Sequence, residues 1–74
     1  MLLIKIIMEE LMAKYEPLNF KLAGQNGNAF VLMGVFSGAA RKAKWAKADI
    51  DKVLEEAMSG DYDHLLKTLI LFQA

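Results

Sequence analysis

Apolar residues recur at helical spacing near the start of the chain. Within residues 4–15 they fall three and four positions apart, while Glu9 and Glu10 lie on the opposite side. This spacing puts the apolar side chains on one helical face and predicts a helix that ends before Pro17. The alternative is a β-strand over residues 2–8, which are rich in isoleucine.

A second pattern, strict alternation, follows at once. Leu18, Phe20 and Leu22 are separated by single polar residues, which is typical of a short strand. A single strand leaves its backbone groups unpaired. We therefore expect it to pair with residues 2–8 as an N-terminal β-hairpin, or with its own copy in a second chain.

The turn residues Gly24–Gly27 precede a longer helix, predicted from Ala29 to Trp45. Asn26 or Asn28 is suited to cap its first turn. The side chains predicted on its buried face are Leu32, Val35, Phe36, Ala39, Ala40 and Ala43.

Two further helices complete the pattern. Apolar residues from Ile50 to Met58 follow helical spacing, and acidic residues occupy the opposite face. Gly60 stands where a helix-ending glycine belongs, and Asp61 is placed to cap the next helix. The side chains predicted to be buried in that last helix are Tyr62, Leu65, Leu66, Leu69 and Ile70.

These elements predict one small α+β domain that is mostly helical, with about four short helices and one short strand. It covers residues 1–74, with 18–72 as its core and 1–16 as an N-terminal extension. The chain is 55% hydrophobic and has no cysteine, so disulfides and thiolate-bound zinc are excluded. So short a chain cannot easily hide this much apolar surface, which favours a homodimer. Nothing in the sequence requires a cofactor.

The N-terminal segment lacks the features of a targeting signal. No basic region precedes its apolar run, Lys5 interrupts the run, and Glu9 and Glu10 follow it. The longest apolar stretch, Ala29 to Ala40, is shorter than the ~20 residues of a membrane span. We therefore expect a cytoplasmic protein that does not contact membranes.

Two segments carry a resemblance to known sequences. Lys21–Phe30 (KLAGQNGNAF) and Ser59–Leu66 (SGDYDHLL), separated by a helix with a basic end and an acidic helix, resemble a group of short uncharacterised proteins from bacteria and phages. The similarity covers about residues 18–72. It implies a phage or mobile-element accessory setting and assigns no activity to any residue.

The segment Ser59–Leu66 also holds the densest group of polar side chains. Asp61, Asp63 and His64 are types that ligate divalent metals. Three ligands within four residues at a helix start seldom converge on one ion, however, and capping alone explains the aspartates. We therefore favour a structural role here over a metal site, and we expect no catalytic residue.

A basic cluster surrounds the only tryptophan. Basic side chains beside an aromatic ring can hold nucleic-acid phosphates and stack on a base. Against this, the nine basic residues are balanced by nine acidic ones, whereas nucleic-acid-binding domains usually carry a basic excess. The candidate nucleic-acid-binding residues are Arg41, Lys42, Lys44, Trp45 and Lys47.

Gly34 and Gly38 lie one helical turn apart and predict a place where another helix or strand packs closely, including across a subunit interface. The leading prediction is a non-enzymatic protein-interaction or accessory protein that acts as a homodimer and contacts another protein. The alternatives are a nucleic-acid-binding module and a metal-dependent role. The residues predicted at the interface are Ile4, Ile7, Met8, Leu11, Phe20, Gly34 and Gly38.

Overall fold

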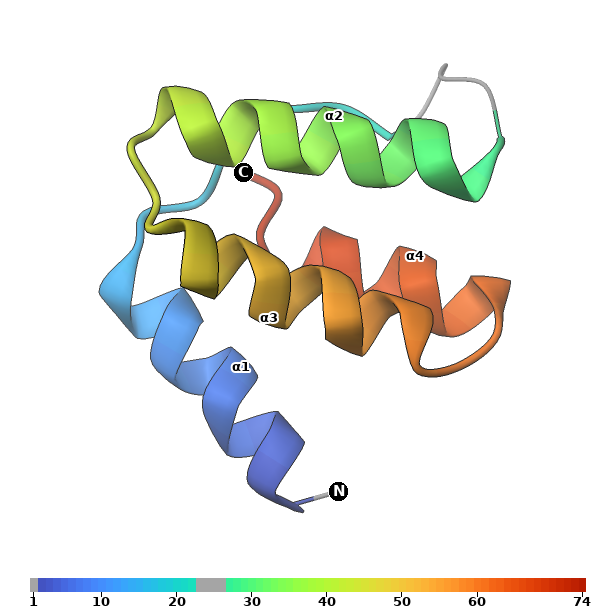
Figure 1. Cartoon of the computed structure of the whole chain (residues 1–74). Coiled ribbons are helices and arrows are strands. Elements are labelled where there is room, and N and C mark those ends of the chain that lie inside the picture. The colour runs from blue at the N-terminus through green and yellow to red at the C-terminus, as the bar shows by residue number, and fades with distance from the viewer. Residues whose placement is uncertain (1, 23–26) are drawn as a thin grey trace.

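The computed structural model describes the backbone of residues 2–22 and 27–74, with side chains from residue 6 onward. Four helices form one small compact domain in this part of the chain, and helix α3 contacts each of the other three. Helices α2 and α3 run antiparallel, α4 lies behind α3, and α1 crosses diagonally below them (Figure 1). The helices are α1 (Leu2–Lys14), α2 (Ala29–Lys42), α3 (Lys47–Met58) and α4 (Tyr62–Ile70).

Helix α1 confirms the helical prediction for the N-terminal segment and excludes the alternative strand over residues 2–8. Met8 and Leu11 are buried among residues of the other helices. Helix α1 therefore packs as part of the domain core. None of the helices in the described ranges is long and apolar enough to cross a membrane.

The predicted strand at residues 18–22 is wrong, because neither residues 2–22 nor 27–74 contain a strand. The alternation correctly predicts which side chains face the core, because Leu18 and Phe20 are buried. With residues 2–8 helical, the segment pairs instead with the C-terminus through one isolated parallel bridge between Leu18 and Gln73. The Leu18 amide donates to the Phe72 carbonyl at 2.7 Å.

Helix α2 begins as predicted and ends earlier. The Asn28 side chain accepts a hydrogen bond from the Phe30 amide at 2.8 Å, which confirms the cap; the alternative, Asn26, lies with most of the predicted turn outside the described residues. The helix stops at Lys42 rather than Trp45. Ala43, predicted on the buried face, is therefore exposed.

The stop is a Schellman motif. The Trp45 amide donates to the Ala40 carbonyl and the Lys44 amide to the Arg41 carbonyl, both at 3.0 Å. This geometry puts Lys44 at φ 68°, the left-handed region that side chains other than glycine disfavour.

We expect Lys44→Gly to raise the free energy of unfolding by about 1 kcal/mol, because glycine removes the steric cost of this conformation. Urea unfolding at one protein concentration measures the gain, with Lys42→Gly as the control. Lys42 is the last residue of α2 and has no left-handed φ, so glycine there should destabilise, by up to about 1 kcal/mol. A loss of stability for Lys44→Gly would contradict the assignment.

Fewer of the predicted side chains of helix α4 are buried than the pattern predicts. Leu65 and Leu69 are in the core, as expected. Tyr62 is 45% exposed and Ile70 is 53% exposed, so both predictions of burial are wrong. Thr68 takes a buried place instead and donates to the His64 carbonyl at 2.8 Å, which satisfies its hydroxyl within the helix.

An aromatic cluster forms the centre of the core. Phe36 is fully buried and meets Phe20, Trp45 and Phe72 at ring-centroid distances of 5.6–6.0 Å. Tyr15 stacks on Trp45 with centroids 4.1 Å apart. The cluster joins the end of α1, the middle of α2 and the C-terminal residues, so it fixes the places of segments distant in sequence.

Candidate functional site

The polar side chains at the α3–α4 junction turn to three different partners. Asp61 accepts a hydrogen bond from the His64 amide at 2.9 Å, which confirms it as the cap of α4. Asp63 pairs with Lys67 at 2.9 Å, and this hydrogen bond raises the pKa of Lys67. The His64 ring reaches back to Glu56. Among the described residues, no three His, Cys, Asp or Glu side chains form a group able to hold a metal ion.

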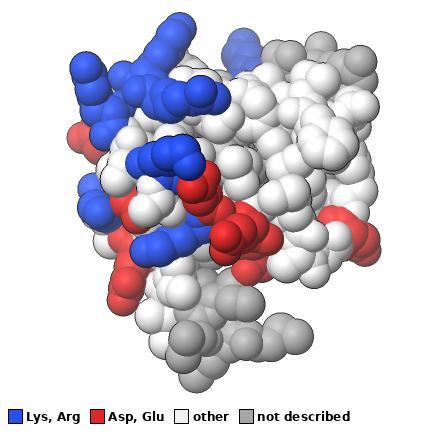
Figure 2. Space-filling model, viewed as in Figure 1, with Lys and Arg blue, Asp and Glu red and all other residues white. Residues whose placement is uncertain are grey.

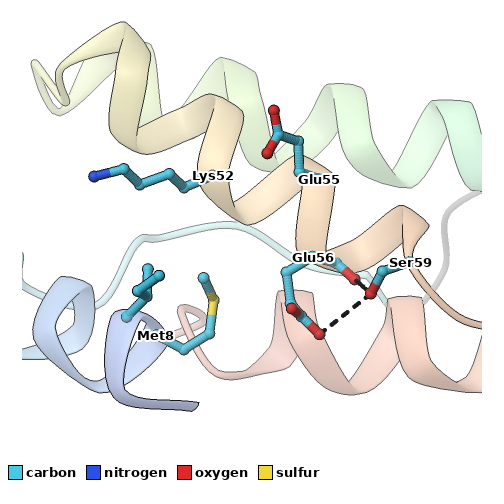
Figure 3. Close-up of a pocket in the computed structure, with 6 residues that line it drawn as sticks. Met8, Lys52, Glu55, Glu56 and Ser59 are labelled. Atoms are coloured by element: carbon cyan, nitrogen blue, oxygen red, sulfur yellow. Dashed lines mark hydrogen bonds between the residues drawn. The ribbon is translucent and has the colours of Figure 1, made fainter. Parts of the chain in front are cut away.

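Glu56 and His64 form the closest pair at this junction. The imidazole Nε2 lies 2.6 Å from the Glu56 carboxylate and 3.0 Å from the Glu56 carbonyl oxygen. Both neighbours are acceptors, so Nε2 carries a proton. Ser59 Oγ donates to the same carbonyl at 2.6 Å, as Figure 3 shows. The last turn of α3 is thus closed by side chains.

This trio does not have the geometry of an activated nucleophile. A catalytic serine donates to one imidazole nitrogen while the acid orients the other. Here the Glu56 carboxylate and Ser59 Oγ approach the same nitrogen, Nε2, at 2.6 and 3.4 Å, and the Ser59 hydroxyl donates its shorter hydrogen bond, 2.6 Å, to the Glu56 carbonyl. The arrangement holds the end of α3 to the start of α4.

A hollow of about 270 Å³ lies beside this trio, between α1 and α3. Figure 3 shows Met8 on one wall and the side chains of α3 on the other. The charged groups do not converge on it: Lys52 reaches Asp49 at 3.7 Å, and Glu56 binds His64. The hollow therefore has no set of polar groups aimed at one ligand.

Gly60 is needed for space rather than for a turn. Gly60 directly follows the C-cap residue Ser59, where the sequence predicts the helix-ending glycine, but its φ is outside the left-handed region. A Cβ atom there would lie 2.9 Å from both Cβ and Cγ of His64. The imidazole thus packs directly over the Gly60 backbone.

We expect Gly60→Ala to lower the free energy of unfolding by about 1–3 kcal/mol, because the methyl group displaces the His64 ring from Glu56. Gly34→Ala is the matched control: no atom lies within 4 Å of a Cβ built there, and alanine favours the helix. It should gain about 0.5–1 kcal/mol. Urea unfolding of both variants measures the contrast, and shifts of the same sign would refute it.

The basic cluster sits where α2 ends and α3 begins, as Figure 2 shows. Lys42 and Lys44 make no ion pair within the described part of the chain, whereas Lys47 pairs with Asp51 at 3.2 Å. Arg41 contacts Ser37 through its guanidinium group at 3.4 Å. The cluster offers cations to an anionic partner.

Trp45 is not available to such a partner. It is only 6% exposed, and its ring lies against Tyr15, Phe36 and Phe72. A base could stack on it only if this packing opened. The cluster therefore lacks the aromatic platform of single-stranded nucleic-acid binders.

The opposite end of the molecule is mostly uncharged in Figure 2, with an acidic patch near its lower edge. Its most prominent residue is Phe30, which is 77% exposed on the first turn of α2. Met58, predicted to be buried, is 56% exposed there. We call this surface the apolar end; it surrounds a hollow of about 240 Å³ and includes Phe30, Met33, Met58 and Tyr62.

The predicted interface residues separate into two groups. Met8, Leu11 and Phe20 belong to the core of the chain, and Ile7 is packed against it. No atom of the described residues lies within 4 Å of a Cβ built on Gly34 or Gly38, so no described side chain packs on them. They remain open to a second molecule. The Ile4 side chain lies outside the described residues.

The sequence pattern missed Phe30 as a surface residue, although a signal was present. At 100° per residue, Phe30 falls between the buried Ser37 and the exposed Gly34 on the helical wheel, which is the edge of the buried face. Because Phe30 is large and precedes a run of buried apolar residues, the sequence pattern suggests that it is buried too. No family model, curated protein or solved structure matches the chain.

Proposed function

We propose that this chain is a small non-enzymatic interaction protein that works as a homodimer. The observation that carries the proposal is Phe30, 77% exposed beside Met58 and Tyr62 at the apolar end. Aromatic and methionine side chains are enriched in protein interfaces, where charged residues are depleted. A contiguous apolar surface of this kind is rarely left in water.

Two further features support the proposal. The polar groups at the α3–α4 junction are engaged in helix ends, which leaves no arranged nucleophile or base among the described residues. The equal numbers of basic and acidic residues also reduce the repulsion between copies. We further propose an accessory setting for this role, which is what the resemblance to short bacterial and phage proteins implies.

Light scattering on the purified chain tests self-association. We expect a mass twice that of the 8.3 kDa chain at micromolar concentration, with dissociation on dilution. A folded monomer at all concentrations would refute the homodimer.

Nucleic-acid binding is a second candidate, favoured by Lys42 and Lys44, which lie near Arg41 and make no ion pair among the described residues. Such binding would be weak, independent of sequence and lost as salt is raised, because only phosphate contacts are available. Arg41→Glu with Lys44→Glu should abolish it. Failure of a mixed nucleic-acid pool to bind at low salt would eliminate this candidate.

A further inference from the structure

Along its outward side, helix α2 carries first the aromatic ring of Phe30, then two glycines without side chains, and finally the cationic side chain of Arg41. Phe30 stands at one end and Arg41 at the other, about 16 Å apart along the axis. Gly34 and Gly38 lie between them with open space above both. We call Phe30, Gly34, Gly38 and Arg41 the α2 outer face.

A hollow of about 380 Å³ opens at the Arg41 end of this face, between α2 and α3. Ile50 and Leu54 give it apolar walls, and Arg41 stands beside Ser37 at its edge. Lys47 and Asp51 also line it and pair with each other at 3.2 Å. Trp45 also lines it, and its buried indole Nε1 has no hydrogen-bond partner among the described residues. The hollow therefore suits an aromatic ring, which is flat and apolar and whose face attracts the Arg41 guanidinium.

We propose that two copies pair antiparallel through the α2 outer face, with Phe30 of each copy in the α2–α3 hollow of the other. This inference rests on the proposed homodimer and specifies its geometry. Residues 30 and 41 are placed almost symmetrically about the midpoint of Gly34 and Gly38. An antiparallel partner centred on that midpoint brings its own Phe30 to the level of Arg41.

The two-fold operation also sets the lateral position of the ring. Phe30 and Arg41 both lie on the side of α2 that borders α3, since each lines a hollow formed with α3 residues. A two-fold axis perpendicular to both α2 helices keeps α3 on the same side in each copy. The partner's Phe30 therefore falls between α2 and α3, where the hollow opens.

The chemistry of the two surfaces is complementary. The Arg41 guanidinium attracts the face of an aromatic ring, and Ile50 and Leu54 remove its edges from water. From Ala29 to Ala40 the helix carries no charged residue, so nothing repels the second helix. Glycine at 34 and 38 permits a close approach of the two backbones.

Engineered cysteines test the arrangement directly, because the natural chain has none. Gly34→Cys and Gly38→Cys chains are purified separately, mixed and oxidised gently. The antiparallel pairing predicts more of the mixed 34–38 disulfide than random pairing yields, whereas a parallel pairing predicts mainly 34–34 and 38–38 products. Ile70→Cys, exposed on α4, is the control that should remain uncrosslinked.

A second variant separates the interface from folding. Gly34→Leu should raise the urea midpoint of the isolated chain, because leucine favours the helix and meets open space. The same side chain should weaken dimerisation by about tenfold or more, because it fills the contact between helices. An unweakened dimer, or a dimer with no mixed disulfide, overturns this geometry and leaves the homodimer standing. A monomeric wild-type chain removes both.

Discussion

Replacing Phe36 with alanine is expected to lower the free energy of unfolding by about 3–5 kcal/mol. The side chain is completely buried and contacts three aromatic rings contributed by three distant parts of the chain. A domain of this length has a total stability of roughly 4–11 kcal/mol. The substitution therefore removes a large share of it, because the surrounding rings cannot close the cavity.

Urea unfolding at one fixed protein concentration measures this loss. Phe36→Leu keeps most of the apolar volume and should cost clearly less than the alanine variant. Ile70→Ala, on an exposed position, should change stability by no more than about 0.5 kcal/mol. Similar losses for Phe36→Ala and Ile70→Ala would show that the aromatic cluster is not the centre of the core.

Asp49→Ala is expected to cost about 2 kcal/mol, because it removes the buried acceptor that joins α1 to α3. The Asp49 side chain is 7% exposed and accepts from the Tyr15 hydroxyl at 2.5 Å and from Lys14 Nζ at 2.9 Å. Asp51→Ala is the matched control. Its pair with Lys47 is solvent-exposed and should contribute no more than about 0.5 kcal/mol.

The same contacts set a pH dependence for stability. The hydrogen bond from Tyr15, followed by that from Lys14, lowers the pKa of Asp49 in the folded state. A carboxyl group with a lowered pKa stabilises the fold above its unfolded pKa, about 3.9, and loses this contribution as the pH falls through its folded value. Relative to Asp49→Asn, the wild-type advantage should therefore shrink below about pH 4. An advantage that grew on acidification would contradict the assignment.

Local rules were sufficient for much of the fold. Asn28 and Asp61 were correctly identified as helix caps, since capping depends on residues only two or three positions away. The strand at residues 18–22 failed for the opposite reason. Alternation specifies which side chains face inward, but a strand also needs a partner, and here the partner is a short C-terminal segment.

The surface was harder to predict than the core. In the sequence Asp49 belongs to an acidic helical face that is expected to be exposed, and its burial depends on a contact with Tyr15, directly after α1. Phe30 presents the converse case, because an aromatic residue in an apolar run reads as core until neighbouring helices are placed. From the sequence we expect a structural role for the α3–α4 junction, and Asp61 does cap α4, but the part of Glu56 in the junction depends on a contact eight residues away.

Sedimentation equilibrium of Phe30→Asp beside Ile70→Asp is the most direct test of self-association through the α2 outer face. Both positions are exposed, and aspartate in the first turn of α2 suits the helix dipole, so both variants should fold. We predict that Phe30→Asp sediments as a monomer while Ile70→Asp remains a dimer. The claim would be contradicted if both variants formed dimers of equal affinity. It would also be contradicted if Ile70→Asp were a monomer while Phe30→Asp remained a dimer.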